Sequence, residues 1–115
     1  MTTETTNYFD NASAQMRKGI LEFCVLLAVS RRQSYASDII EVLKGRDLLV
    51  VEGTLYPLLS RLRESELVKY EWIESREGPP RKYYSLTNKG EEILKELINR
   101  WQQLATSLTH LINRP

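Results

Sequence analysis

The sequence predicts a mainly α-helical domain that carries a small two-stranded β-hairpin and ends in a long helix. Three observations support this fold class. Apolar residues recur at steps of three and four in three segments of the first half. Two segments rich in β-branched and aromatic residues then flank a Gly-Pro-Pro turn, and a leucine-rich heptad pattern closes the chain. This order is that of a winged helix-turn-helix followed by a long C-terminal dimerisation helix.

Size and charge limit what this domain can do. The 115 residues fit one domain, and 16 Lys and Arg against 15 Asp and Glu leave a net charge of +1. A uniformly basic surface is therefore excluded, so any site for a polyanion requires local clustering of cations. The single Cys24 favours a reducing compartment. Residues 1–10 lack a signal-peptide core, and the apolar run 23–29 is too short to span a bilayer, so we expect a cytoplasmic protein without a membrane partner.

The first half of the chain predicts an arm and two helices. Residues 1–10 are Thr-rich and lack periodicity, so we interpret them as a flexible N-terminal arm before a winged helix-turn-helix domain over residues 11–87. An apolar stripe predicts the first helix from about residue 11 to 29. Ser34 is the expected N-cap of a short second helix, and Gly45 is expected to end it in a left-handed conformation.

The third helix is predicted at about residues 52–66. Pro57 is tolerated only near a helix start, which places that start between residues 51 and 54, and Thr54 is the best capping residue there. Its apolar face consists of Leu55, Leu58, Leu59 and Leu62. The helix then exposes a face that includes Gly53, Pro57, Ser60 and Glu64, flanked by Thr54, Tyr56, Arg61 and Arg63.

That exposed face has small residues in its N-terminal half and fits a DNA major groove. Tyr56, Thr54 and Ser60 have hydroxyls for bases or phosphates, and Arg61 and Arg63 reach the backbone. An ordinary solvated helix face explains the same pattern equally well.

A hairpin, or wing, is predicted at about residues 67–86, with strands at 68–74 and 81–86 and a turn at 75–80. Pro79 and Pro80 stiffen the turn. The cations Arg76, Arg81 and Lys82 suit contact with phosphates, although charges also protect an edge strand from aggregation, and nearby acids (Glu71, Glu74, Glu77) weaken the case for DNA. We expect most of the hairpin aromatics to form cross-strand packing pairs, namely Tyr70, Trp72, Tyr83 and Tyr84.

The final helix, over residues 88–115, is predicted to begin after an N-cap at Thr87. Its apolar seam follows heptad steps and exceeds what the core of so small a domain needs, which favours packing against the same helix of a second subunit. The seam comprises Leu94, Leu97, Trp101, Leu104, Leu108 and Leu111.

Catalysis has no candidate residues. His110 lies off the apolar seam, Cys24 lies on an apolar stripe, and no nucleophile has an evident base. The sequence has no metal-ligand spacing and no Gly-rich phosphate loop, so we expect neither an enzyme nor a cofactor.

Two motifs resemble those of PadR-family transcriptional regulators. Residues 53–62, GTLYPLLSRL, are similar to the family's third helix, and residues 78–87, GPPRKYYSLT, followed by Gly90, are similar to its wing. Tyr35 lies where the family has a tyrosine at its second helix. One departure is Glu66, where members usually have glycine, a residue that adopts positive φ without strain.

The resemblance implies a homodimeric repressor of the small subgroup with one C-terminal helix. Its partners would be a pseudopalindromic double-stranded operator and a small aromatic or amphipathic effector, for which Trp101 is a candidate stacking residue. A tryptophan that only packs in the seam is the alternative. A winged-helix dimer that binds a protein or small molecule without specific DNA binding is the other functional hypothesis. The predicted DNA-binding residues are Tyr35, Thr54, Tyr56, Pro57, Ser60, Arg61, Arg63, Arg81 and Lys82.

Overall fold

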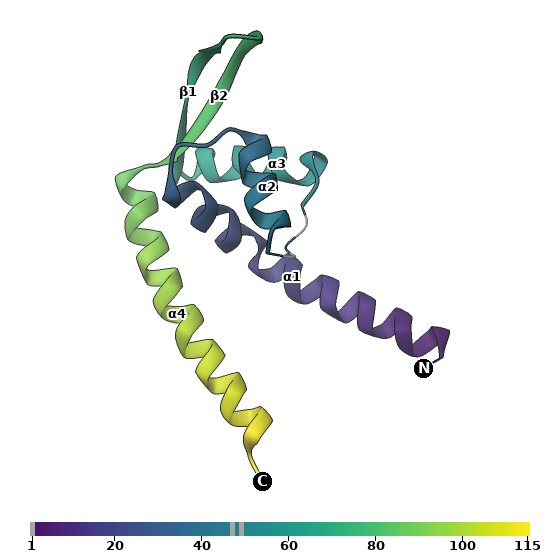
Figure 1. The fold of residues 1–115 in the computed structure, drawn as a ribbon. Coiled ribbons are helices and arrows are strands. Elements are labelled where there is room, and N and C mark those ends of the chain that lie inside the picture. Colours follow the sequence, from purple (N-terminus) through teal and green to yellow (C-terminus); the bar gives the residue numbers. More distant parts are fainter. Residues whose placement is uncertain (1, 47, 49) are drawn as a thin grey trace.

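The computed structural model describes residues 2–46, 48 and 50–115, and these form a compact head from which a hairpin and two long helices project (Figure 1). The molecule measures 56 × 35 × 23 Å along its principal axes. The elements in chain order are α1 (Thr3–Arg31), α2 (Ala36–Lys44), α3 (Glu52–Glu64), β1 (Val68–Ser75), β2 (Gly78–Leu86) and α4 (Asn88–Asn113). This mainly helical fold with one two-stranded antiparallel sheet confirms the predicted fold class.

Helix α1 begins at Thr3, so the prediction of a flexible arm over residues 1–10 is wrong for its described part. The hydroxyl of Thr2 accepts from the backbone N–H of Thr5 and caps the helix. Glu4 in the first turn is favourable to the helix dipole. The polar, Thr-rich residues at the start of α1 have no apolar stripe. They are nevertheless helical, as a continuation of the buried C-terminal half of α1.

The connection between α1 and α2 differs from the predicted cap. Tyr35 is the N-cap of α2, and its backbone N–H donates to the Asp38 carboxylate at 3.2 Å. Ser34 is instead buried in a one-residue bridge to Tyr84, with N–H to carbonyl distances of 3.0 and 2.7 Å. Gly45 has a right-handed helical φ of −64°, so the expected left-handed C-cap is also wrong.

Helix α3 begins within the predicted window, at Glu52, but Val51 is its N-cap and makes no side-chain hydrogen bond. Thr54 lies inside the helix, so its prediction as the cap is wrong. Pro57 therefore falls beyond the first turn and cannot donate to the Gly53 carbonyl. The predicted apolar face is confirmed, because its four leucines are all buried: Leu55, Leu58, Leu59 and Leu62.

The hairpin β1–β2 has a shorter turn than predicted, because Pro79 and Pro80 lie in β2. Its register pairs Tyr70 with Tyr84 and Trp72 with Lys82, and a bulge lies between Ile73 and Ser75. Both prolines are exposed on an edge strand, where the lack of a backbone N–H removes little hydrogen bonding.

The core lies where the C-terminal half of α1 meets α2, α3 and the base of the hairpin. Its largest fully buried side chains are Leu26, Ile39, Leu55, Leu59, Leu62, Val25 and Val68. From α4, by contrast, Leu94 is the buried side chain. The core therefore holds the head together and leaves most of α4 outside it.

The end of α3, the start of β1 and the start of α4 pack closely together at one junction. The Thr87 hydroxyl donates to the Glu66 carbonyl at 2.6 Å and accepts from the Gly90 N–H at 2.9 Å, which confirms Thr87 as the cap of α4. Glu66 has a φ of 63°, a conformation that a side chain rarely adopts. The junction therefore holds Glu66 in a backbone conformation that glycine adopts without strain.

We expect Glu66→Gly to raise the free energy of unfolding by about 1 kcal/mol, because glycine removes the steric cost of positive φ. Urea denaturation measures the change. Glu66→Ala is the matched control, since it removes the carboxylate and keeps the strain. An equal gain in both variants would show that charge, not backbone conformation, is responsible.

Candidate nucleic-acid interface

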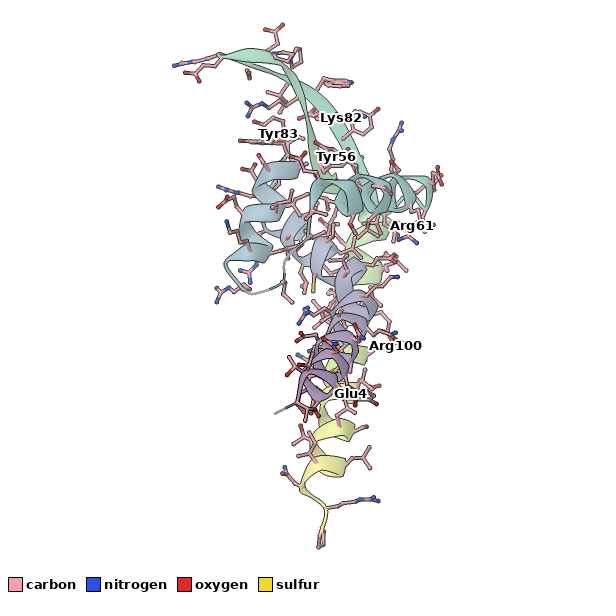
Figure 2. The ribbon with its side chains drawn as sticks, turned by 90° about the vertical axis from the view of Figure 1, so that its right-hand side faces the viewer. Glu4, Tyr56, Arg61, Lys82, Tyr83 and Arg100 are labelled. Carbon is pink, nitrogen blue, oxygen red and sulfur yellow. The ribbon has the colours of Figure 1, made fainter. Side chains whose placement is uncertain are left out.

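A cleft of about 530 Å³ separates the hairpin from the N-terminal ends of α2 and α3. We call it the wing cleft. Its walls are mainly aromatic and cationic side chains, with one carboxylate from α3. The lining residues are Tyr35, Ala36, Ser37, Glu52, Tyr56, Trp72, Pro80, Arg81, Lys82 and Tyr84. In Figure 2, Tyr56 and Lys82 lie between α3 and the hairpin.

The structure divides the predicted DNA-binding residues into two groups. Tyr35, Tyr56, Arg81 and Lys82 come from three separate elements and meet in the wing cleft. The others are exposed on α3 and do not line the cleft: Thr54, Pro57, Ser60, Arg61 and Arg63. Figure 2 shows Arg61 further along α3 than Tyr56. The first group lines the wing cleft, and the second group lies on the outer surface of α3.

The wing cations rest on aromatic rings. The guanidinium of Arg81 lies 4.8 Å from the centre of the Tyr35 ring. The ammonium of Lys82 lies 4.6 Å from the Tyr70 ring and 5.3 Å from the Trp72 ring. Such contacts attract a cation to the ring face and limit its rotamers. The charges of β2 are thus held beside the cleft.

Tyr84 forms the neutral floor of the wing cleft. Burial raises the pKa of its phenol, and the neighbouring phenols of Tyr56 and Tyr70 raise it further, while Arg63 acts in the opposite direction. The phenol therefore stays protonated at neutral pH. The floor thus adds no negative charge that would repel a phosphate.

Sequence reasoning missed several cleft residues. Glu52 lines the cleft at the first position of α3, and Trp72 is 62% exposed beside Lys82. Trp72 and Tyr70 were predicted as cross-strand packing residues, and the Tyr70–Tyr84 pair, with ring centres 5.8 Å apart, confirms that role in part. The hairpin alternation could have shown that both rings share a strand face with Lys82.

The apolar seam on α4 is buried only at its start. Leu94 is buried and Leu97 half-buried, whereas Trp101 is 39% exposed and the remaining leucines are exposed: Leu104, Leu108 and Leu111. Phe23 of α1 meets Trp101 with ring centres 6.3 Å apart. Beyond this contact α1 and α4 diverge (Figure 1). Both helices therefore expose apolar side chains beyond this contact.

The described residues offer little to catalytic chemistry. Cys24 is buried, and desolvation raises the pKa of its thiol, which leaves it an inert core residue. Across residues 2–46, 48 and 50–115, His, Cys, Asp and Glu form no group able to hold a metal ion. None of the helices in those ranges has the length and apolar character needed to cross a membrane.

A helix-turn-helix whose second helix faces a two-stranded hairpin defines the class of this molecule as a winged-helix protein. Its sequence matches the profile of the transcriptional regulator PadR-like family over residues 25–96. The chain therefore belongs to the PadR-like family. Its members are DNA-binding transcriptional regulators and not enzymes.

Solved structures support the same assignment. A PadR-like transcription factor from Bacteroides fragilis is 54% identical, covers 88% of this chain and 98% of its own, and superposes with a TM-score of 0.74. A PadR-like transcriptional regulator from Bacillus cereus is 35% identical, with coverages of 88% and 99% and a TM-score of 0.78. A PadR family transcriptional regulator from Eggerthella lenta is 26% identical, covers 99% of this chain and all of its own, and has a TM-score of 0.90.

Proposed function

We propose that this protein is a homodimeric transcriptional repressor that binds a pseudopalindromic double-stranded operator in the cytoplasm. The wing cleft carries the proposal, because it joins hydroxyls of α2 and α3 to held cations of β2 on one side of the head. A protein with a net charge of +1 needs such clustering to bind a polyanion.

The exposed face of α3 enters the major groove. There Thr54, Tyr56 and Ser60 contact base edges or phosphates. Pro57 lets the helix approach the bases closely, and Arg61 contacts the DNA backbone. Tyr35 places a ring and a hydroxyl at the start of α2, and the wing lies on flanking phosphates. Two copies of α3 read half-sites separated by about 34 Å, one turn of DNA.

Dimerisation supplies that spacing. Beyond the Phe23–Trp101 contact both helices expose apolar side chains, which are Leu104, Leu108 and Leu111 on α4 and Phe9 and Met16 on α1. A second copy covers both, because two antiparallel α4 helices bury their seams against each other. The alternative function, a winged-helix dimer that binds a protein partner, finds support in the acids of the wing, Glu71, Glu74 and Glu77.

Selection of bound duplexes from random DNA tests the function directly. We expect enrichment of an inverted repeat whose half-sites are about one helical turn apart. Absence of any enriched sequence, with a dimer that still binds small molecules or proteins, would favour the alternative function.

We expect Arg81→Ala to weaken binding to the selected duplex and to flatten its salt dependence. Loss of one phosphate contact lowers the slope of log affinity against log salt by about 0.9 for each bound subunit. Mobility-shift titrations at several salt concentrations measure this slope. Arg100→Ala is the control, because Arg100 pairs with Glu96 on α4 at 3.0 Å, away from the wing. Equal slopes for wild type and Arg81→Ala would remove Arg81 from the interface.

We further propose that a planar aromatic effector stacks on Trp101 in the dimer interface and releases the operator by changing the separation of the two heads. In a Trp72→Phe background, in which Trp101 is the remaining tryptophan, a planar phenolic acid should quench fluorescence and weaken operator binding. Quenching that persists unchanged in Trp101→Phe with Trp72 retained would place the ligand elsewhere.

A further inference from the structure

Two adjoining cavities lie along one side of α1, away from the wing. The larger, of about 550 Å³, is lined in part by Leu21 of α1 and Thr54 of α3. The smaller, of about 360 Å³, lies between α1 and α2 and includes Val42. Cys24 and Leu48 line both cavities, so we treat the two as one elongated site and call it the α1 groove. Each volume falls within the range of small-molecule pockets, about 300–1,000 Å³.

The charged side chains among the described lining residues of the α1 groove are all cations. They are Arg17, Lys18, Arg31 and Arg46. Other cavities of the head include a carboxylate, such as Glu52 in the wing cleft and Glu91 in a cavity between α1 and α4. Cys24 adds no negative charge, because burial raises the pKa of its thiol. The described lining of the α1 groove therefore favours an anionic ligand.

Arg17 and Lys18 lie on either side of an apolar strip of α1. Successive residues are about 100° apart around a helix, so Leu21, one turn further along, falls between the two cations. Both cations are exposed, and neither lies within 4 Å of a carboxylate among the described residues. Glu22, four residues after Lys18, does not line the cavity. The guanidinium of Arg17 suits bidentate contact with a carboxylate, and Lys18 adds a point charge.

The smaller cavity leaves apolar surface in contact with water. Val42 is 46% exposed, and Leu27 opposite it on α1 is half-buried. The rise of α1 from Arg17 to Ala28 is about 17 Å. An apolar chain of similar length, with its acid group beside Arg17, covers Leu27 and Val42 and removes their surface from water.

We propose that the α1 groove binds a monocarboxylate with one long apolar chain. The carboxylate lies between Arg17 and Lys18, and the chain runs past Cys24 toward Val42. The described lining residues come from α1, α2, α3 and the segment between α2 and α3, so the site needs neither α4 nor the wing. It is therefore separate from the effector proposed at Trp101, and its test requires no DNA.

Isothermal titration calorimetry of the full-length protein with dodecanoate, kept below its micelle-forming concentration, tests the site. We expect saturable binding of one dodecanoate per subunit. Dodecyltrimethylammonium has the same chain and a positive head group, so it should show no saturable binding. Equal binding of the two amphiphiles would show that apolar adsorption alone is responsible and would overturn the proposal.

The position of the carboxylate is tested by removing each cation. We expect Arg17→Ala and Lys18→Ala each to weaken dodecanoate binding about two- to fivefold, and the double variant roughly tenfold, as for partly exposed ion pairs. Arg31→Ala, at the other end of the α1 groove, is the matched control and should change the affinity less than twofold. Unchanged affinity in the double variant, or a loss confined to Arg31→Ala, would overturn the assignment of Arg17 and Lys18.

The position of the chain is tested by filling the larger cavity. Ala14 is exposed and lines that cavity, so Ala14→Trp should weaken dodecanoate binding at least tenfold without disturbing the core. Gln15→Trp is the control, because Gln15 is exposed and does not line the cavity. Circular dichroism of each variant verifies the fold.

Leu108→Glu separates the α1 groove from the apolar seam of α4. We expect this variant to bind dodecanoate as wild type does, because α4 contributes none of the described lining residues. Loss of binding in Leu108→Glu together with retained binding in Ala14→Trp would place dodecanoate on the seam and overturn the proposal.

Discussion

Gly90→Ala should unfold the protein or lower its free energy of unfolding by about 3 kcal/mol or more. A Cβ at Gly90 would lie 2.0 Å from the carbonyl oxygen of Leu67 and 3.0 Å from its carbonyl carbon. Both atoms belong to the backbone of the residue just before β1, so no side chain can rotate away. The start of α4 would have to move off the junction that Thr87 closes, which costs more than ordinary overpacking.

Thermal and urea denaturation of Gly90→Ala measure this loss, and Gly19→Ala is the matched control. Gly19 is also inside a helix, but a Cβ added there would meet nothing within 4 Å. Alanine at this position should increase stability by about 0.5–1 kcal/mol, because glycine is the poorer helix former. A Gly90→Ala variant as stable as wild type would show that α4 can shift away from Leu67 without loss.

Leu108→Glu should convert the proposed dimer to monomers and abolish tight operator binding. Leu108 lies on the exposed part of the apolar seam, where two copies of the substitution place two carboxylates in one interface. Loss of the buried leucines alone weakens association by about a hundredfold or more. Sedimentation velocity measures the dimer, and the fold of the head should persist because Leu108 takes no part in its core.

His110→Glu provides the control for charge on the same helix. His110 is exposed and lies on the face of α4 opposite Trp101, so this variant should remain dimeric. Dimeric Leu108→Glu that binds operator as wild type does would place the dimer interface outside the seam. Monomers in both variants would indicate that added negative charge, and not the seam, controls association.

The sequence predicted each element whose pattern arises from burial. The four leucines of α3 and the alternating hairpin residues reflect one buried face each, and those periods are visible in any single chain. The start of α1 was missed because residues 3–10 bury nothing, so no apolar stripe indicates a helix there. Ser34 was assigned to a cap because its bridge to Tyr84 joins positions far apart in the sequence.

The same distinction applies to the candidate site. The sequence indicates Arg81 and Lys82 as cations of a wing motif, and the structure places them in the wing cleft with Tyr56 and Tyr35. The roles of Tyr70 and Trp72 could not be predicted, because a ring that pairs across strands and a ring that holds a cation give the same alternation. Only the relative placement of α3 and the hairpin brings Arg63 to Tyr70.

The Thr87 hydroxyl hydrogen-bonds both to the segment that follows α3 and to the first turn of α4, so the two helices meet at one pivot. Helix α4 is a rod of 26 residues, about 39 Å long, anchored to the head at this end. A tilt of about 5° at the pivot displaces the far tip by about 3 Å, given that length. In the proposed dimer each rod acts as a lever, through which a small change between the distal ends of the two rods becomes a rotation of the proposed DNA-reading surfaces.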